Sequence, residues 1–136
     1  MYIYLKDIEP ITLNHSHKIT TSGKFATMYK TTDYKQFESA VELQLRKCKA
    51  EFNKLNNKLD ENKTCLKIDY KFYFPYMTKT RTIRKKYKDI DNLIKPLQDQ
   101  LFKHISLDDS YVTELSASKI HSLNTYIEIN VKIITY

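Results

Sequence analysis

The stretch LKIDYKFYFP, residues 66–75, has a clear strand pattern. Apolar or aromatic side chains occupy every second position from Leu66 to Phe74, and mostly charged side chains fill the positions between them. Successive side chains of a strand point to opposite faces of a sheet, so the alternation predicts a strand with one buried face. Pro75 has no backbone N–H to give to a neighbouring strand and is expected to end it.

The segment before this strand has the spacing of a long helix. Asp33 is expected at its N-cap, with Gln36 three residues later completing a capping box. The apolar residues that follow are separated by steps of three and four, which is typical of one buried helix face. They are Tyr34, Phe37, Val41, Leu45, Cys48, Phe52, Leu55 and Leu59. This stripe indicates core packing rather than a functional surface.

The two ends of the chain supply the remaining strands. A short strand is expected at residues 2–8, and a loop or a weak hairpin is expected at residues 10–32. Residues 111–120 and 125–134 predict two more strands, the second with Ile127, Ile129, Val131 and Ile133 on one face.

A second helix is expected after the basic connection at residues 76–88. Pro96 should lie in its first turn, because a proline deeper inside would break the backbone ladder. The resulting order is strand, helix, strand, helix, strand, strand. It predicts a single α+β domain over residues 1–136, in which helices pack on one side of a mixed β-sheet.

Composition restricts the function. The 136 residues carry 23 Lys and Arg against 16 Asp and Glu, a net charge of +7. This favours an anionic partner, although a basic surface also serves solubility alone. The single glycine, Gly23, excludes phosphate-binding glycine loops, so no nucleotide cofactor is expected. The Cys48 and Cys65 thiols suggest neither a disulfide framework nor a zinc site.

Other features point to a protein of the cytoplasm. No apolar run reaches membrane length, and charges appear too early for a signal peptide. The closely spaced His15 and His17 have no further zinc ligand near them in the sequence and indicate a surface loop. The richness in Lys, Asn, Ile and Tyr suits an AT-rich bacterial or phage genome.

Two pairs of acids flank the second helix. On an extended segment, Asp89 and Asp91 would present both carboxylates to one point. Asp108 and Asp109 follow the helix, and the segment after the helix could bring one of them close to Asp89 and Asp91. Magnesium prefers such oxygen ligands, together with water and substrate phosphate.

Simpler interpretations of these acids remain open. Asp91 or Asn92 could cap the helix, and the later pair could form a solvated turn. A calcium loop is excluded, because Ile94 and Gln100 replace its required glycine and glutamate. Lys95 could neutralise a phosphate in a transition state, or could form an ordinary i to i+4 salt bridge with Asp91.

The stretch KDIDNLIKPLQDQL, followed by ISLDDSYVTELSASK, resembles the RusA family of Holliday junction resolvases. The family shows two acids one residue apart, then Asn, a lysine, an inward aspartate and an Asp-Asp pair. The matching residues here are Asp89, Asp91, Asn92, Lys95, Asp99, Asp108 and Asp109. The family often has a glycine before the Asp-Asp pair, and KHISL has none, which puts the geometry of that turn in question.

The resemblance implies a site and a partner. Asp89, Asp91 and Asp109 would bind Mg²⁺, or Mn²⁺ in its place, with Asp108 as a further contributor. Lys95 would be the essential cation near the scissile phosphate, and Asp99 would support the site from behind. The family acts as a homodimer that recognises four-way DNA junctions and nicks two opposed strands.

DNA contacts are expected from the basic run and from the N-terminal loop PITLNH, which carries Asn14. The residues of the run expected to bind phosphates are Arg81, Arg84, Lys85, Lys86 and Lys88. Tyr73, Tyr76 and Tyr87 either stack on an unpaired base or pack within the protein, and packing is the preferred interpretation.

The sequence therefore predicts a metal-dependent endodeoxyribonuclease that resolves Holliday junctions in DNA recombination and repair. Two alternatives stay open. One is a non-catalytic or regulatory DNA-binding protein with a RusA-like fold. The other is a less selective nuclease acting on branched DNA.

Overall fold

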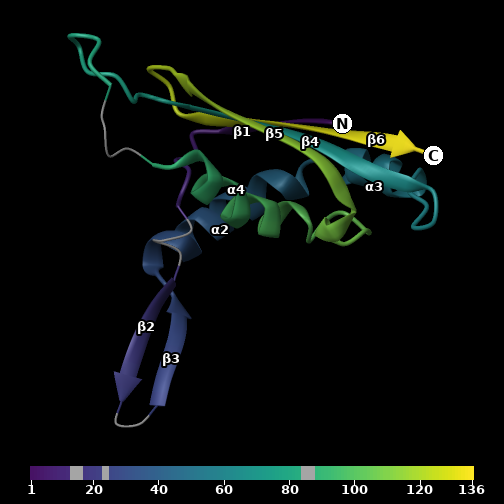
Figure 1. Ribbon diagram of the computed structural model, residues 1–136, viewed down its shortest axis with the longest axis horizontal. Coiled ribbons are helices and arrows are strands. Elements are labelled where there is room, and N and C mark those ends of the chain that lie inside the picture. Colours follow the sequence, from purple (N-terminus) through teal and green to yellow (C-terminus); the bar gives the residue numbers. More distant parts are fainter. Residues whose placement is uncertain (13–16, 23–24, 84–87) are drawn as a thin grey trace.

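A computed structural model describes residues 1–12, 17–22, 25–83 and 88–136, with the backbone alone described for 17–22 and 25–30. Its main sheet has the strand order β1-β6-β4-β5 (Figure 1). The strands are β1 (Tyr2–Lys6), β4 (Thr64–Phe74), β5 (Val112–His121) and β6 (Tyr126–Thr135). The β1–β6 and β6–β4 pairs are antiparallel, whereas β4 and β5 are parallel, so the sheet is mixed as predicted.

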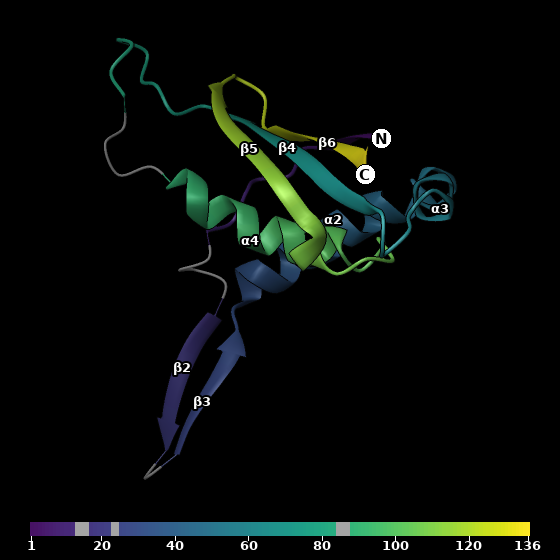
Figure 2. The ribbon, with the colours of Figure 1, turned by 45° about the vertical axis from the view of Figure 1, so that its right-hand side comes forward.

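Three helices lie on one side of this sheet: α2 (Thr32–Arg46), α3 (Lys49–Asn57) and α4 (Ile90–Leu101). Figures 1 and 2 show them together beneath the strands, which confirms the expected α+β class and one-sided packing. A short 3₁₀ helix, η1 (Asp109–Tyr111), leads into β5. None of the helices described is long and apolar enough to span a membrane.

The core forms between the helices and one face of the sheet. Alternate side chains of β4 from Leu66 to Phe74 are at most 1% exposed, so the pattern of the central strand is confirmed. Ile127, Ile129 and Val131 of β6 join them, and Ile133 packs partly buried at the margin. Burying such side chains stabilises a domain by about 1.5–3 kcal/mol for each large apolar residue.

The predicted long helix is two helices, α2 and α3, with one shared stripe. Lys47 and Cys48 interrupt it, but their backbone angles stay near the helical region (φ −67°, ψ −16° and φ −97°, ψ 18°). The interruption is therefore a bend, and the three-and-four spacing keeps its phase across it. Phe52 and Leu55 of α3 are consequently buried beside Leu45 of α2 in the same core.

The predicted cap of the first helix was wrong. Thr31, not Asp33, is the N-cap, and its Oγ1 accepts a hydrogen bond from the Tyr34 amide at 3.2 Å. Asp33 lies in the first turn, where a negative charge interacts favourably with the helix dipole. Both residue types are good N-caps, so local sequence alone did not separate them.

The predicted position of Pro96 was also wrong. It lies inside α4, well past the first turn, and its ring is buried. Proline cannot supply the N–H that would normally reach the carbonyl of Asn92. The helix continues nevertheless, because Leu93, Leu97 and Leu101 must share one buried face. Tertiary burial thus outweighs the local preference against proline.

Residues 10–32, expected as a loop or weak hairpin, contain a two-stranded antiparallel hairpin. It pairs β2 (His17–Ser22) with β3 (Phe25–Lys30) and is separate from the main sheet. Figures 1 and 2 show it extending away from the helices. His15 lies outside the described residues, and His17 begins β2.

We expect Thr31→Ala to lower the free energy of unfolding by about 1 kcal/mol, because the Tyr34 amide loses its acceptor. Asp33→Ala is the matched control and should cost less than Thr31→Ala, near the lower end of the about 0.3–1 kcal/mol of an exposed interaction with the helix dipole. Urea unfolding followed by circular dichroism measures both. If Asp33→Ala lowers the free energy of unfolding more than Thr31→Ala does, Asp33 and not Thr31 is the effective N-cap.

Candidate active site

The first acid of the motif, Asp89, lies at the N-terminus of α4. It is the N-cap residue in an extended conformation (φ −71°, ψ 134°), yet its side chain makes no capping hydrogen bond. Its carboxylate is exposed and does not cap the backbone amides of the helix. The helix end and its dipole also favour negative charge or a phosphate group at this place.

Asp91 lies in the first turn of α4 rather than on an extended segment. The extended conformation predicted for both acids is therefore present at Asp89 but wrong for Asp91. Helical geometry instead places Asp91 one turn before Lys95 on the same side of α4. Neither Asp91 nor Asn92 is the N-cap, because the helix begins at Ile90.

Lys95 joins the two separated parts of the motif. Its Nζ lies 2.7 Å from Asp99 Oδ1, one turn later in α4, and 3.5 Å from Asp109 Oδ2 in η1. The hydrogen bond to Asp99, and then the charges of Asp99 and Asp109, raise the pKa of Lys95. The ammonium group therefore stays charged. Asp99 and Asp109, not Asp91, are thus the ion-pair partners of Lys95, and the simple Asp91–Lys95 salt bridge is not observed.

A buried hydroxyl supports this group from the sheet. Tyr70 of β4 is fully buried, and its hydroxyl donates to Gln98 Oε1 of α4 at 2.9 Å. Burial, and then the charges of Asp109 and Asp99, raise the pKa of Tyr70 well above its usual range. Tyr70 is thus a neutral donor that fixes the α4 turn carrying Lys95 and Asp99 over the sheet.

Asp108 caps η1. Its Oδ1 accepts from the Asp109 amide at 2.8 Å, and its Oδ2 accepts from Ser110 Oγ at 3.0 Å. These hydrogen bonds, that of Ser110 first, lower the pKa of Asp108. Asp108 therefore shapes the turn that presents Asp109, even without the glycine expected before it. Its role as a metal ligand stays a prediction.

The acids fit a hard cation in chemistry, although they do not form a complete cage. Asp89, Asp91 and Asp109 offer only oxygen atoms, the donors that Mg²⁺ prefers. Among the residues that the structure describes, no group of three or more His, Cys, Asp and Glu side chains is arranged to hold a metal ion. Magnesium usually binds through one or two carboxylates together with substrate phosphates, so a site completed by DNA is compatible with this arrangement.

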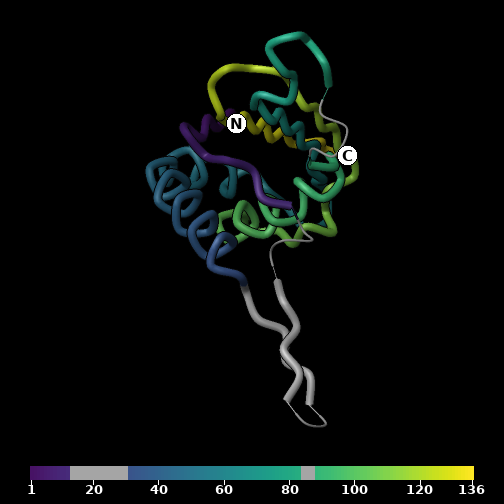
Figure 3. The backbone as a smooth tube through the Cα atoms, turned by 90° about the vertical axis from the view of Figure 1, so that its left-hand side faces the viewer, coloured from purple at the N-terminus to yellow at the C-terminus, as the bar shows by residue number. Residues whose placement is uncertain are grey.

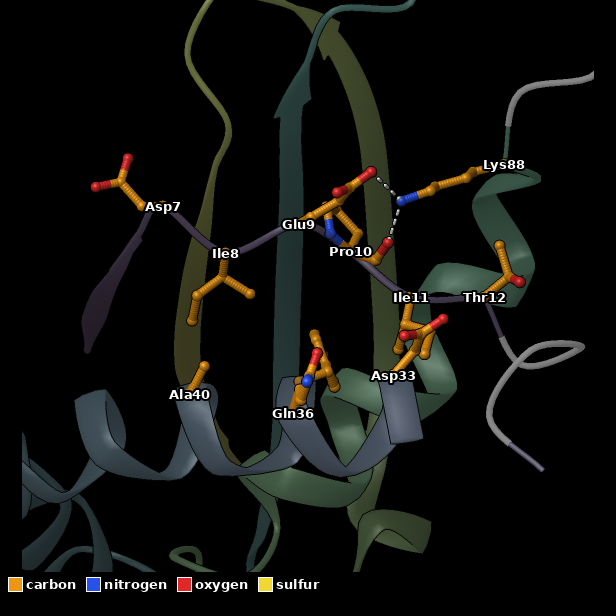
Figure 4. Close-up of a pocket in the computed structure, with 11 residues that line it drawn as sticks. Asp7, Ile8, Glu9, Pro10, Ile11, Thr12, Asp33, Gln36, Ala40 and Lys88 are labelled. Atoms are coloured by element: carbon orange, nitrogen blue, oxygen red, sulfur yellow. Dashed lines mark hydrogen bonds and ion pairs between the residues drawn. The ribbon is translucent and has the colours of Figure 1, made fainter. Parts of the chain in front are cut away.

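A hollow of about 630 Å³ lies between residues 7–12 and α2, and Lys88, which precedes α4, also lines it (Figure 4). The Nζ atom of Lys88 lies 3.1 Å from Glu9 Oε1 and also donates to the Pro10 carbonyl. The carbonyl of Lys88 accepts from Lys119 Nζ of β5 at 3.0 Å. The residue next to Asp89 is thus held by the N-terminal segment and by the sheet. Lys88, predicted to contact DNA, is already engaged within the protein.

His121, the last residue of β5, holds the start of the basic connection. The Nδ1 atom of His121 accepts from the amides of Tyr76 and Met77, both at 3.2 Å, at the end of β4. Beyond them a turn from Thr78 to Thr82 places Arg81 in the left-handed region (φ 59°) with its side chain exposed. Arg81 is therefore accessible to a phosphate. Figure 3 views the molecule from the end at which this connection and α4 begin.

Several predicted contacts lie outside the described residues. They are Asn14, Arg84, Lys85, Lys86 and Tyr87. Of the other two tyrosines, Tyr73 stacks on Tyr126 with ring centroids 4.1 Å apart, and Tyr76 packs edge-on against His121 at 5.4 Å. Both therefore pack within the protein, as preferred from the sequence.

Sequence reasoning missed Lys119, Glu9 and the Tyr70–Gln98 pair. Lys119 is paired with Phe72 of β4, which puts its side chain on the helix side of the sheet. A lysine at an inward strand position is the signal that could have identified it, but strand pairing was needed to recognise the position. Tyr70 looked like any other core residue of the alternating strand.

A family model described as "Endodeoxyribonuclease RusA" matches residues 7–132, which is most of the chain. No match was found among curated proteins. The matched range contains the helix α4, the 3₁₀ turn and the whole of the Lys95 group.

We expect Lys95→Ala to change the free energy of unfolding by no more than about 1 kcal/mol, because ion pairs between exposed groups contribute about 0.2–1 kcal/mol. The side chains of Lys95, Asp99 and Asp109 are 50%, 41% and 37% exposed, so solvent screens them. Chemical denaturation measures the change in the free energy of unfolding, and Tyr70→Phe provides the comparison at a buried position. A loss of several kcal/mol for Lys95→Ala would make its main role structural.

Proposed function

The chain belongs to the RusA family of endodeoxyribonucleases, and from that premise we propose that it is a metal-dependent nuclease that resolves four-way DNA junctions. The observation that carries the proposal is the position of Lys95. Its ammonium group connects α4, whose N-cap is Asp89, with Asp109 of η1. The turn with Asp108 and Asp109 is thereby joined to the helix that carries Asp91, which supports the proposal of a site for a phosphodiester.

Asp89, Asp91 and Asp109 are the residues that would hold Mg²⁺ or Mn²⁺, with Asp108 shaping the turn behind Asp109. A bound ion supplies a more acidic water and neutralises charge on the phosphate oxygens. The reaction is hydrolysis, in which the oxygen of water bonds to phosphorus and the bond to the 3′ oxygen breaks. The products are a 5′ phosphate and a 3′ hydroxyl, as expected for the family.

Lys95 would act on the phosphate itself. Negative charge builds on the phosphoryl oxygens in the transition state, and a fixed cation stabilises that charge. Asp99 holds Lys95 in place and raises its pKa, so the cation persists at neutral pH. Asp99 is accordingly a positioning residue. The contact of Lys95 with Asp109 keeps the cation beside a proposed metal ligand.

DNA binding would use the surface around the start of α4. The net charge of +7 favours a polyanion, and Arg81 is exposed on the connection that precedes α4. Arg84, Lys85, Lys86 and Asn14 remain candidates. Lys88 would have to exchange Glu9 for a phosphate, so we expect it to contribute less than Arg81. A homodimer would supply two sites for two opposed cuts.

A second candidate is a DNA-binding protein of the same fold that does not cut. It is favoured by one observation, namely that the described acids form no preassembled three-residue metal group. It predicts salt-sensitive binding to branched DNA without any magnesium-dependent product. Four-way, three-way, flap and linear duplexes, incubated with and without Mg²⁺, separate this candidate from a junction resolvase and from a less selective nuclease.

We expect Asp91→Asn to abolish cleavage of a four-way junction, because an essential metal ligand is lost, while junction binding is retained. The amide removes a charge without removing bulk. Single-turnover cleavage and gel-shift binding in Ca²⁺ measure the two effects. Cleavage at the wild-type rate would remove Asp91 from the mechanism.

We expect Lys95→Ala to slow cleavage by about 10²–10³-fold, the range seen when one group that stabilises transition-state charge is removed. The Mg²⁺ concentration at half-maximal rate should change little, because Lys95 is not a ligand. Lys103→Ala, an exposed lysine just after α4, is the control. A normal rate for Lys95→Ala would leave Lys95 as a surface ion pair.

A further inference from the structure

The strand β1 lies at one edge of the main sheet, with β6 as its neighbour. Met1 and Val131 exchange two backbone hydrogen bonds, of 2.7 and 2.8 Å. In an antiparallel pair such exchanges recur at every second residue, so the next residue of β1 to bond β6 is Ile3. The backbone N–H and C=O groups of Tyr2 and Tyr4 therefore point away from the sheet.

One side chain occupies this edge at its far end. The Lys6 amide donates to Gln44 Oε1 of α2 at 2.8 Å, and Gln44 Nε2 donates to the Lys6 carbonyl at 2.7 Å. The Gln44 amide group thus supplies the acceptor and the donor that a residue of a neighbouring strand would supply. This contact agrees with the outward direction of alternate backbone groups along β1, and it closes the edge at Lys6.

The edge stays open at Tyr2 and Tyr4. Within the described part of the chain, no group bonds the outward backbone N–H or C=O of either residue. Donors and acceptors therefore alternate along this edge, and an extended polypeptide matches them because its own backbone alternates in the same way. The phosphates of DNA only accept hydrogen bonds and would leave both carbonyls without a donor.

A hollow of about 550 Å³ adjoins the open edge at Tyr2, so α3 does not cover this part of β1. Its apolar lining comes from Leu55 of α3 and from Val131 and Ile133 of β6. Leu55 and Val131 belong to the core, and Ile133 packs partly buried against it. A strand added along β1 could therefore place one apolar side chain in this hollow.

The rim of the hollow is positively charged. Lys54, Lys58 and Lys132 are exposed, and none of them forms an ion pair with the residues that the structure describes. Glu51 is the one acid in the lining. Burial, and then the charges of Lys58 and Lys132, lower the pKa of the Met1 ammonium group. The local potential is thus positive and favours a carboxylate.

Lysines near a sheet edge also keep copies of a chain from pairing edge to edge. Pairing of two β1 strands would bring the Lys58 and Lys132 groups of both copies close together, and like charges would oppose it. The same charges attract an acidic strand. The lysines therefore favour a different chain, of opposite charge, over a second copy at this edge.

We propose that the β1 edge at Tyr2 and Tyr4, with the adjoining hollow, binds an extended acidic segment of a partner protein as an added strand. An apolar side chain of the segment enters the hollow beside Leu55, and its carboxylates lie near Lys58 and Lys132. Both chain termini lie at this end of the sheet, whereas α4 begins toward the opposite end (Figure 1). The partner therefore leaves the candidate active site open, and the proposal does not depend on nuclease activity.

The first test uses a short fluorescein-labelled peptide in which aspartate alternates with valine and phenylalanine is last. We expect saturable binding by fluorescence anisotropy. A peptide with lysine in place of aspartate, and one with its central backbone nitrogens methylated, should each bind about tenfold more weakly, because charge attraction or backbone pairing is lost. Absence of saturable binding overturns the proposal, and so does equal affinity for either altered peptide.

Protein variants test the same contacts from the other side. Tyr2→Pro removes an outward N–H that does not bond β6, so β1 should stay in the sheet, whereas peptide affinity should fall about tenfold. Tyr2→Phe keeps the backbone and is its control. Lys58→Glu combined with Lys132→Glu should weaken binding to a similar extent, and Lys103→Glu, at an exposed lysine just after α4, should not. Unchanged affinity in Tyr2→Pro or in the double variant contradicts the proposal.

Amide hydrogen exchange of the natural chain, followed by NMR, needs no variant. The Tyr2 and Tyr4 amides should exchange rapidly in the free protein and slowly with the peptide bound. The Ile3 and Leu5 amides, which point to β6, should be protected in both states and serve as internal controls. A bound peptide that leaves the Tyr4 amide unprotected lies elsewhere, and the proposal then fails.

Two further outcomes identify other occupants. Self-association of the natural chain that is lost in Tyr2→Pro assigns the edge to a second copy and overturns the proposal. Linear duplex DNA that displaces the peptide assigns the lysines to DNA and overturns it as well. Peptide binding by a chain that cuts no branched DNA retains the surface and rejects the proposed nuclease, so the two proposals fail separately.

Discussion

One cation between two carboxylates fixes the geometry on which the candidate site depends. The Lys95 ammonium group holds Asp99 within its own helix and Asp109 in the turn before β5. Beneath it, Tyr70 donates from the sheet to Gln98 of the same helix. The helix, the turn and the sheet are therefore oriented by a few polar contacts at the edge of a hydrophobic core. Because the side chains of Lys95, Asp99 and Asp109 are 37–50% exposed, they can serve a ligand without costing the fold much stability.

Patterns with a strict period were predictable from the sequence, whereas features that depend on distant contacts were not. The alternation of β4 and the stripe of α2 and α3 follow from burial on one face, and both were confirmed. The N-cap of α2 was predicted wrongly because local rules favour Thr31 and Asp33 almost equally. The position of Pro96 was predicted wrongly because the packing of Leu93 and Leu97 outweighs the local preference against proline. The parallel pairing of β4 with β5, which brings Lys119 inward, has no local signature.

The candidate site shows the same division. Its candidate acids and Lys95 were predicted from their order and spacing and from the family resemblance, and their roles stay predictions. Which carboxylates Lys95 would contact could not be deduced, since a lysine can reach either helical neighbours or a separate turn. Nor could the sequence show that Lys88 is held by Glu9, a residue far away in the chain. Ion pairs of long side chains depend on the final packing of elements, which spacing alone does not specify.

The place of β6 in the sheet has a consequence for how the chain acquires its structure. Among the strands described, β6 comes latest in the chain, and it is an interior strand, with β1 on one side and β4 on the other. Its contacts with β1 join residues about 130 positions apart, as in the bonds between Met1 and Val131. On the ribosome, the edges of β1 and β4 that face β6 must therefore stay open until β6 has been synthesised. Folding of this sheet should be slow, since contacts distant in sequence are entropically costly to form.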